Sequence, residues 1–358
     1  MARIDLDLAH AYRPNPREDS DYALLPLKMR FEDGGAYALL GPSGCGKTTL
    51  LNLVSGLLSP SQGTVHFDGA DVTHASPQQR NIAQVFQFPV IYDTMSVAQN
   101  LAFPLRNRKV PEDQIRRRVA EIAEMLDLSG DLDRRASGLS ADAKQKISLG
   151  RGLVRPDVSA VLFDEPLTVI DPHLKWQLRR KLKQIHQELK LTLVYVTHDQ
   201  VEALTFADQV VVMTRGRSVQ VGTAEALFER PQHTFVGHFI GSPGMNFLQA
   251  RAEGGRLQVP GVDLSLPAGR ALADGDYKLG VRPEYVTLAQ PLAPGALPAT
   301  VTRIQDVGTH LLLTAEAGGQ PLKARLAPGL AVPAKGETTW LQVVGEHTCF
   351  YANEELVA

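Results

Sequence analysis

The sequence predicts an α/β fold with a parallel sheet, followed by a small all-β domain. From about residue 1 to 240, short apolar runs alternate with helical stretches, which is typical of a sheet covered by helices. A glycine-rich loop, Gly41–Gly46, joins one apolar run directly to a helical stretch. After Asn246, short alternating runs separated by glycine and proline replace this pattern and favour a small β-barrel.

The composition bounds the class of protein. A chain of 358 residues is too long for one hydrophobic core, so we expect two domains, 1–240 with a helical subdomain at about 88–155, and 245–358. A net charge of −2 offers no basic face for nucleic acid. No apolar run reaches the ~20 residues that span a bilayer, the first residues lack the apolar core of a secretory leader, and two cysteines form no disulfide framework. We therefore expect a cytosolic chain that reaches a membrane only through partners.

The first part of a nucleotide site lies between Ala36–Leu40, a predicted buried strand, and a helix predicted from Thr48 to Leu58. Gly41–Thr49 fits the pattern of glycine, four residues and Gly-Lys-Thr, which requires this strand–loop–helix context. Backbone N–H groups and the positive end of the helix dipole then face phosphates. A glycine-rich turn that fits by chance is the alternative. The expected nucleotide-binding residues are Ser43, Gly44, Cys45, Gly46, Lys47, Thr48 and Thr49.

Two side chains of this loop have specific expected roles. Lys47 bridges the β- and γ-phosphates of ATP, and the Thr48 hydroxyl ligates Mg²⁺. Cys45 is expected to be packed inside the loop rather than to be catalytic.

Carboxylates follow a second predicted strand, Val158–Phe163. Asp164 and Glu165 stand at its end, where ligands of a parallel sheet bind. Asp164 can hold Mg²⁺ through water, and Glu165 is placed to polarise the attacking water as a general base. Taken alone, a strand that ends in two carboxylates is more often a solvated loop edge.

A third apolar strand, Leu191–Thr197, ends in His198. This histidine could hydrogen-bond the γ-phosphate and keep Glu165 and the water in register. A purely structural histidine is the alternative.

In this order, the three pieces resemble the nucleotide-binding subunit of ABC transporters, and more narrowly the ATPases of carbohydrate and polyol importers of the maltose and glycerol-phosphate uptake type. The resemblance covers nearly the whole chain, and Gly222–Leu248 and Gly280–Glu284 resemble this importer subfamily specifically. It implies a P-loop NTPase fold, an ABC-type nucleotide-binding domain with a helical subdomain, followed by an OB-like, TOBE-type domain that mediates dimer contacts or regulation. For that last domain, a purely structural dimerisation cap is the alternative to a site that binds a regulatory effector.

The resemblance also implies further site residues. Gln87 matches the Q-loop, with a catalytic role and a share of the Mg²⁺ site, and Thr168–Asp171 matches the D-loop. Tyr12 stands where the family stacks an aromatic ring on adenine. The polar insertion Arg13–Asp21, read as a hairpin loop, lengthens the interval from Tyr12 to the phosphate loop and leaves Tyr22 as the alternative.

The segment that binds the nucleotide of a partner ATPase departs from the family. Counting back from Arg151 places Ser140 on the serine of the family's Leu-Ser-Gly-Gly-Gln signature, so Ser140 can still bind nucleotide. Ala141 and Asp142 replace both glycines, and Ala143 replaces the glutamine. The Asp142 carboxylate either repels a γ-phosphate or turns outward and caps the helix.

Two glycines in the same helix, Gly150 and Gly152, stand where the family favours alanine. Each lowers helix propensity by about 1 kcal/mol. The sequence therefore suggests a helix released from its usual constraint.

The helical subdomain is expected to contain an amphipathic helix from Val110 to Leu128. Before it, Phe88–Tyr92 is unusually apolar for a loop. It either packs into the subdomain core or forms a groove for a cytosolic helix of a permease.

These features predict an ATP-hydrolysing motor subunit of an importer for a sugar, polyol or glycerol-type solute. The implied partners are two integral-membrane permease subunits at the cytoplasmic face of the inner membrane, an extracytoplasmic solute-binding protein acting indirectly, and no nucleic acid. The altered signature favours a heterodimer with a paralogous ATPase whose signature is intact, over a homodimer. A non-hydrolytic regulatory subunit and a soluble ABC ATPase without a transport role are the alternatives.

Overall fold

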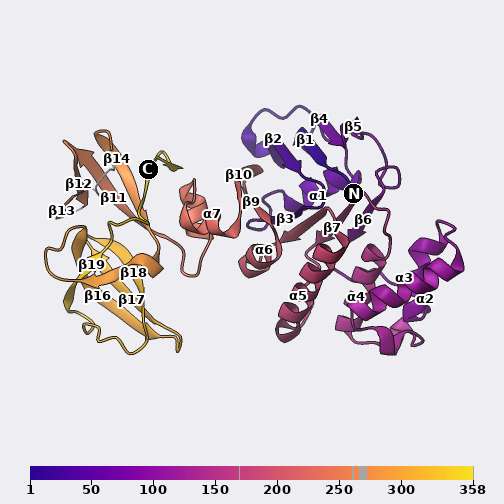
Figure 1. Cartoon of the computed structure of the whole chain (residues 1–358). Helices are drawn as coiled ribbons and strands as arrows, with labels where there is room; N and C mark the ends of the chain where they lie inside the picture. The colour runs from indigo at the N-terminus through magenta and orange to yellow at the C-terminus, as the bar shows by residue number, and fades with distance from the viewer. Residues whose placement is uncertain (169, 260–261, 266–271, 358) are drawn as a thin grey trace. The chain divides into compact units, whose positions relative to one another are not determined.

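The computed structural model describes residues 1–357 except 169, 260–261 and 266–271, so Val169 of the predicted D-loop lies outside the described residues. The chain divides into two compact units, Met1–Ala224 and Glu225–Ala358 (Figure 1). Each unit has its own hydrophobic cluster.

A six-stranded sheet forms the centre of the N-terminal unit. Its strands are β3 (Ala36–Leu40), β6 (Ile82–Val85), β7 (Ala160–Asp164), β8 (Leu193–Thr197), β9 (Gln209–Thr214) and β10 (Arg217–Gly222), in the order β10-β9-β3-β8-β7-β6. All neighbours pair in parallel except β10, which is antiparallel to β9. Every residue of β3 and β8 is buried, as expected for strands covered on both faces.

A smaller antiparallel sheet and three helices complete this part of the unit. The sheet contains β1 (Ile4–His10), β2 (Leu24–Phe31), β4 (Gln62–Phe67) and β5 (Ala70–Asp71), in the order β2-β1-β4-β5. The helices are α1 (Lys47–Ser55), α5 (Pro172–Leu189) and α6 (Gln200–Phe206). Leucines of α1 share one hydrophobic cluster with residues of both sheets, so α1 and the loop before it are fixed from two sides.

The helical subdomain consists of α2 (Val97–Arg106), α3 (Glu112–Met125) and α4 (Ala141–Leu153). The amphipathic helix predicted from Val110 to Leu128 is confirmed as α3, which is shorter at both ends. Its residues Ile115, Val119 and Ile122 are buried, which is the spacing that a helix covered on one face requires.

The two glycines of α4 have a packing reason that the sequence concealed. A Cβ on Gly150 would lie 2.5 Å from a methyl carbon of Leu101 in α2, and a Cβ on Gly152 would lie 2.6 Å from a methyl carbon of Val85 in β6. The interpretation of a helix released from constraint is therefore wrong. Glycine lets α4 approach these larger neighbours closely.

The C-terminal unit contains two antiparallel sheets that share one hydrophobic cluster. The first has the order β13-β12-β11-β14-β20-β21 and the second β15-β19-β16-β17-β18. The bounds are β11 Asn246–Glu253, β12 Arg256–Val259, β13 Val262–Ser265, β14 Gly275–Val281, β15 Thr287–Ala289, β16 Ala296–Asp306, β17 Leu311–Ala317, β18 Gln320–Leu326, β19 Thr338–Gln342, β20 Cys349–Ala352 and β21 Glu355–Leu356.

Two short helices, α7 (Ala224–Glu229) and α8 (Thr234–Phe239), precede these strands. The buried guanidinium of Arg282 donates hydrogen bonds to the carbonyl oxygens of Leu227, Phe228 and Ile240. These bonds attach the helical segment to the C-terminal sheets.

Candidate functional site

The glycine-rich loop has the strand–loop–helix context that its pattern requires, because it connects β3 to α1. Gly44 and Gly46 have φ angles of 78° and 103°, a left-handed backbone that glycine adopts at low cost. A Cβ on Gly41 would lie 2.2 Å from the carbonyl oxygen of Met213. The backbone path itself therefore demands these glycines, which argues against a chance match.

Lys47 begins α1 and is buried inside the loop. Its Nζ donates hydrogen bonds to the carbonyl oxygens of Gly41 at 2.8 Å and Pro42 at 3.1 Å. Cys45 is also buried, and burial raises the pKa of its thiol against the opposing effect of Lys47. Cys45 is thus a packed thiol. The Lys47 ammonium folds back onto the loop that would bind the phosphates.

Thr48 connects the loop to the carboxylate at the end of β7. Its hydroxyl donates to Asp164 Oδ1 at 3.3 Å. Burial and the charge of Glu165 raise the pKa of the Asp164 carboxyl, whereas the Thr48 hydrogen bond and Lys47 lower it. A hydroxyl and a half-buried carboxylate side by side are hard oxygen donors, the kind that Mg²⁺ prefers, so the donor set fits this ion.

Glu165 and His198 face each other across the same edge. His198 Nδ1 lies 3.1 Å from Glu165 Oε2, and the Thr168 hydroxyl donates to that oxygen at 3.2 Å. Glu165 has a φ of 49°, an uncommon left-handed backbone for a residue other than glycine. Such a strained residue is characteristic of functional turns.

Gln87 lies two residues beyond the end of β6, and its side chain is half-buried. The parallel pairing of Val85 with Phe163 carries Gln87 to the end of the sheet where Asp164 and Glu165 stand. The structure therefore brings the carboxyl ends of β3, β6, β7 and β8 together, as the sheet rule for ligand sites requires.

The two aromatic alternatives lie near one cavity. Tyr12 is 65% exposed, and its hydroxyl is 3.0 Å from Thr49 Oγ1 in the first turn of α1. The cavity beside it has a volume of about 730 Å³ and is lined partly by the insertion, through Arg13, Pro14, Asn15 and Pro16. Tyr22 accepts a hydrogen bond at 3.3 Å from Gln62, another lining residue. Tyr12 is the one that contacts the helix of the phosphate loop.

The altered signature opens α4. Ser140 is the N-cap, and its hydroxyl accepts from the Ala143 N–H at 3.3 Å. Asp142 does not cap the helix. Its Oδ2 lies 3.6 Å from Lys146 Nζ, and its Oδ1 is buried without a hydrogen-bond partner among the described residues. The carboxylate is thus partly neutralised by Lys146 and by the positive end of the helix dipole.

Two polar contacts at this edge have no signal in the sequence. The buried Gln145 side chain of α4 donates to the Pro166 carbonyl oxygen at 2.6 Å, directly after Glu165. Glu202 in α6 is also buried, and it accepts a hydrogen bond from the hydroxyl of Thr197, the residue before His198. Neither belongs to a motif, and only the tertiary fold brings them to the site.

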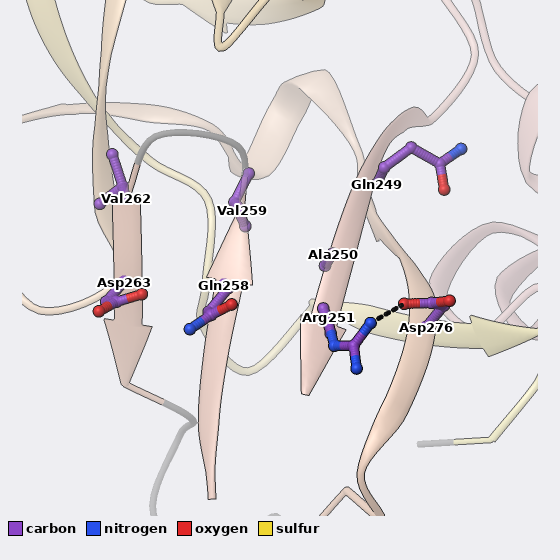
Figure 2. Close-up of a pocket in the computed structure, with 8 residues that line it drawn as sticks. All are labelled: Gln249, Ala250, Arg251, Gln258, Val259, Val262, Asp263 and Asp276. Atoms are coloured by element: carbon purple, nitrogen blue, oxygen red, sulfur yellow. Dashed lines mark ion pairs between the residues drawn. The ribbon is translucent and has the colours of Figure 1, made fainter. Parts of the chain in front are cut away.

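A separate cavity of about 690 Å³ lies on the first sheet of the C-terminal unit (Figure 2). Figure 2 shows Arg251 and Asp276 facing each other, with an Nη1–Oδ1 distance of 3.7 Å. Gln249, Gln258 and Asp263 supply the other polar groups. The described residues of this lining include no nucleophile, and the described part of the chain holds no cluster of three metal-ligating side chains.

Comparisons with known proteins agree along the chain. The model of the ABC transporter family matches residues 24–168, that of the MalK OB fold domain residues 241–286, and that of the TOBE domain residues 279–350. No described helix is long and apolar enough to cross a membrane.

Curated relatives match over most of their length. The sn-glycerol-3-phosphate import ATP-binding protein UgpC of Salmonella typhimurium is 42% identical over 89% of this chain and 90% of its own. The protein of the same name from Paracoccus denitrificans is 40% identical over 94% of this chain and 93% of its own. Among solved structures, cbiO1 from Clostridium perfringens, part of the ABC transporter complex cbiONQ, matches with a TM-score of 0.57 and 28% identity over 64% of this chain and 90% of that one.

Proposed function

The chain belongs to the ABC transporter family of ATP-binding proteins, and from that premise we propose that it is the ATP-hydrolysing motor of an importer for a glycerol-type solute. The single observation that carries the hydrolytic role is the placement of Glu165 and His198, 3.1 Å apart, at the edge where Thr48 meets Asp164. A chain that only docked would have no use for a carboxylate and an imidazole held in this relation.

Each residue of this edge has a role in the proposed reaction. Lys47 exchanges the carbonyl oxygens of Gly41 and Pro42 for phosphate oxygens, so its ammonium is already at the loop when ATP binds. Tyr12 stacks on the adenine ring. The phosphates lie on the backbone N–H groups at the start of α1.

Thr48, Asp164 and Gln87 would hold Mg²⁺, directly or through water. The ion would supply positive charge to the phosphate oxygens. A cation here would also offset the burial and the Glu165 charge that oppose ionisation of Asp164.

Glu165 is the proposed general base. Its carboxylate orients a water molecule and takes up a proton as the water oxygen bonds to the γ-phosphorus and the bond to the β–γ bridging oxygen breaks, so that ADP is the leaving group. His198 and Thr168 both contact Oε2, which leaves Oε1 of Glu165 for the water.

The solute class follows from the relatives. Two of them are named for the import of sn-glycerol-3-phosphate, which supports a glycerol-type solute within the wider range of sugars and polyols. Selection of the solute would rest with the permease and binding-protein chains, and this chain would attach to the permeases at the cytoplasmic face.

We further propose that the motor is asymmetric. Ala141 adds a methyl group where a glycine backbone would approach a γ-phosphate, and Asp142 adds a carboxylate. Two like charges about 4 Å apart repel by about 4 kcal/mol at an effective dielectric constant of 20. Lys146 reduces this repulsion without restoring the missing backbone approach. A second ATPase with an intact signature would complete the site that contains Lys47 and Glu165.

Glu165→Gln tests the proposal in the complex purified from source membranes through a tag on this chain. Loss of at least about a hundredfold in ATP turnover, with ATP still bound, is the expected result for removal of a general base. Turnover unchanged by Glu165→Gln would show that the hydrolytic site belongs to another chain.

One observation favours a second candidate, a regulatory subunit that binds ATP without hydrolysing it. Asp142 puts a carboxylate, only 3.6 Å from Lys146 Nζ, where the signature of the family has a glycine, and this charge would oppose the phosphates of a partner's nucleotide. In that case native mass spectrometry would find a second ATPase in the complex, and Glu165→Gln would leave turnover unchanged.

A further inference from the structure

We propose that Glu202 is a positioning residue for hydrolysis: it holds the turn that carries His198, and its ion pair with Lys175 makes that position depend on α5. The inference rests on the proposed function, because it assigns a role within the same hydrolytic site. It concerns a residue outside every motif that the sequence displays.

Glu202 is a charged side chain in a buried position. It lies in the first turn of α6 and is 4% exposed. Its Oε2 accepts hydrogen bonds from the Thr197 hydroxyl at 2.7 Å and the Tyr195 hydroxyl at 3.0 Å. Burial and the Glu202 charge raise the pKa of Tyr195 well above its usual value, so the phenol stays a donor. A buried carboxylate is tolerated only with such partners, which makes the arrangement stiff.

Thr197 extends this arrangement around His198. The hydroxyl that donates to Glu202 also accepts from the Asp199 N–H at 3.0 Å. Asp199 in turn caps α6 by accepting from the N–H groups of Val201 and Glu202. The residues before and after His198 are therefore both fixed to α6, which holds the backbone from which the imidazole reaches Glu165.

Lys175 connects the same carboxylate to α5. Its Nζ lies 3.7 Å from Glu202 Oε1, and its side chain is only partly exposed. The segment that leads into α5 begins at Glu165, and the Thr168 hydroxyl within it contacts Glu165. Movement of α5 would thus reach the catalytic edge along the chain from Thr168 and through space from Glu202.

A purely structural role for the cluster makes a different prediction from a positioning role. Structural damage lowers thermal stability and ATP affinity together with the rate. Loss of positioning lowers the rate constant alone, because a small misplacement of a reacting group is costly while nucleotide contacts elsewhere persist. It also has no effect once His198 is gone.

The experiment compares Glu202→Gln and Lys175→Met in the tagged complex. Glutamine keeps the shape and an oxygen for Thr197 but removes the charge that attracts Lys175. Methionine removes the ammonium group of Lys175. Because this position is partly exposed, we expect the fold to tolerate the change. Lys181→Met is the matched control, since Lys181 also lies on α5 and pairs with Asp127 instead.

We expect each test variant to lower kcat by about tenfold with unchanged ATP affinity, and the control to change neither. In a His198→Ala background the same variants should lower residual hydrolysis no further. Unchanged kcat in both test variants, a parallel loss of ATP affinity, or a full additional loss in the His198→Ala background would each overturn the proposal. Glu165→Gln is measured in the same experiment to distinguish failure of the proposed function from failure of this inference. If Glu165→Gln retains turnover, the proposed function fails and this inference fails with it.

Discussion

The surroundings of Asp164 disfavour the ionised form of its carboxyl group. Burial and Glu165 raise the pKa of the Asp164 carboxyl in the folded chain. The folded state therefore binds this proton more tightly than the unfolded state does. The resulting stability is present below the ordinary carboxyl pKa of 3.8 and is lost as pH rises through the folded value. At neutral pH the ionised carboxylate costs stability, which is a common property of functional sites.

Asp164→Asn should consequently stabilise the chain while removing Mg²⁺-dependent hydrolysis. Asparagine keeps an oxygen that can accept from Thr48 but carries no charge. We expect an increase of about 2 °C in melting temperature at pH 7.5 without nucleotide, and a smaller increase as the pH is lowered toward the folded pKa of Asp164. Thermal unfolding over a series of pH values measures it, with the exposed Asp133→Asn as control. A lower melting temperature would mean that the Asp164 charge stabilises the loop.

At the scale of elements, α4 holds the apolar segment Phe88–Tyr92 in place. Three side chains of α4 contact this segment or Asp93, which follows it: Lys144, Ser148 and Arg151. Lys144 pairs with Asp93, Ser148 Oγ accepts from the Val90 N–H, and Arg151 donates to the Val90 carbonyl oxygen at 2.6 Å. Phe88 is 68% exposed, so core packing does not explain it. These contacts hold the segment against α4 and support the hypothesis that it forms a groove for a cytosolic helix of a permease.

Phe88→Asp should uncouple transport from hydrolysis. A carboxylate in an apolar helix-binding groove costs more than 1.4 kcal/mol, so we expect solute uptake to fall at least about tenfold while ATP affinity is retained. Uptake into reconstituted vesicles measures the effect. Leu292→Asp, at an 82% exposed position of the C-terminal unit, is the control. Normal uptake by the Phe88 variant would exclude the groove.

Gly150→Ala tests the packing of α4 against α2. Alanine improves helix propensity by about 1 kcal/mol, whereas overpacking in a close-packed core costs about 1–3 kcal/mol. Because the added methyl group would meet Leu101 at 2.5 Å, we expect a net loss of stability in urea unfolding. Gly130→Ala, where a Cβ meets nothing within 4 Å, is the comparison. A gain in stability at Gly150 would restore the interpretation that this helix is merely unconstrained.

At the scale of the whole molecule, the altered signature decides how many copies of this chain a working motor contains. Rebuilding it with Ala141→Gly, Asp142→Gly and Ala143→Gln restores the close backbone approach to a partner's phosphate. We expect turnover of the complex to rise about twofold, because a second site then contributes. No rise, or native mass spectra with two copies of this chain and no other ATPase, would contradict the asymmetric motor.

The sequence by itself determined the α/β class, the C-terminal β unit and the family, and it predicted the residues proposed to bind nucleotide. These signals are local: a glycine loop, an apolar strand ending in carboxylates, and a histidine after a strand each depend on neighbours along the chain. The helix from Glu112 was equally readable from its periodicity.

Only the tertiary structure decided the contacts between segments far apart in the chain. It showed that Ser140 rather than Asp142 caps α4, that Gly150 makes room for Leu101, and that Lys175 reaches Glu202 from another helix. Such contacts depend on how elements pack. A pattern along one element specifies which face is buried, but it does not specify which side chain of a distant element meets that face.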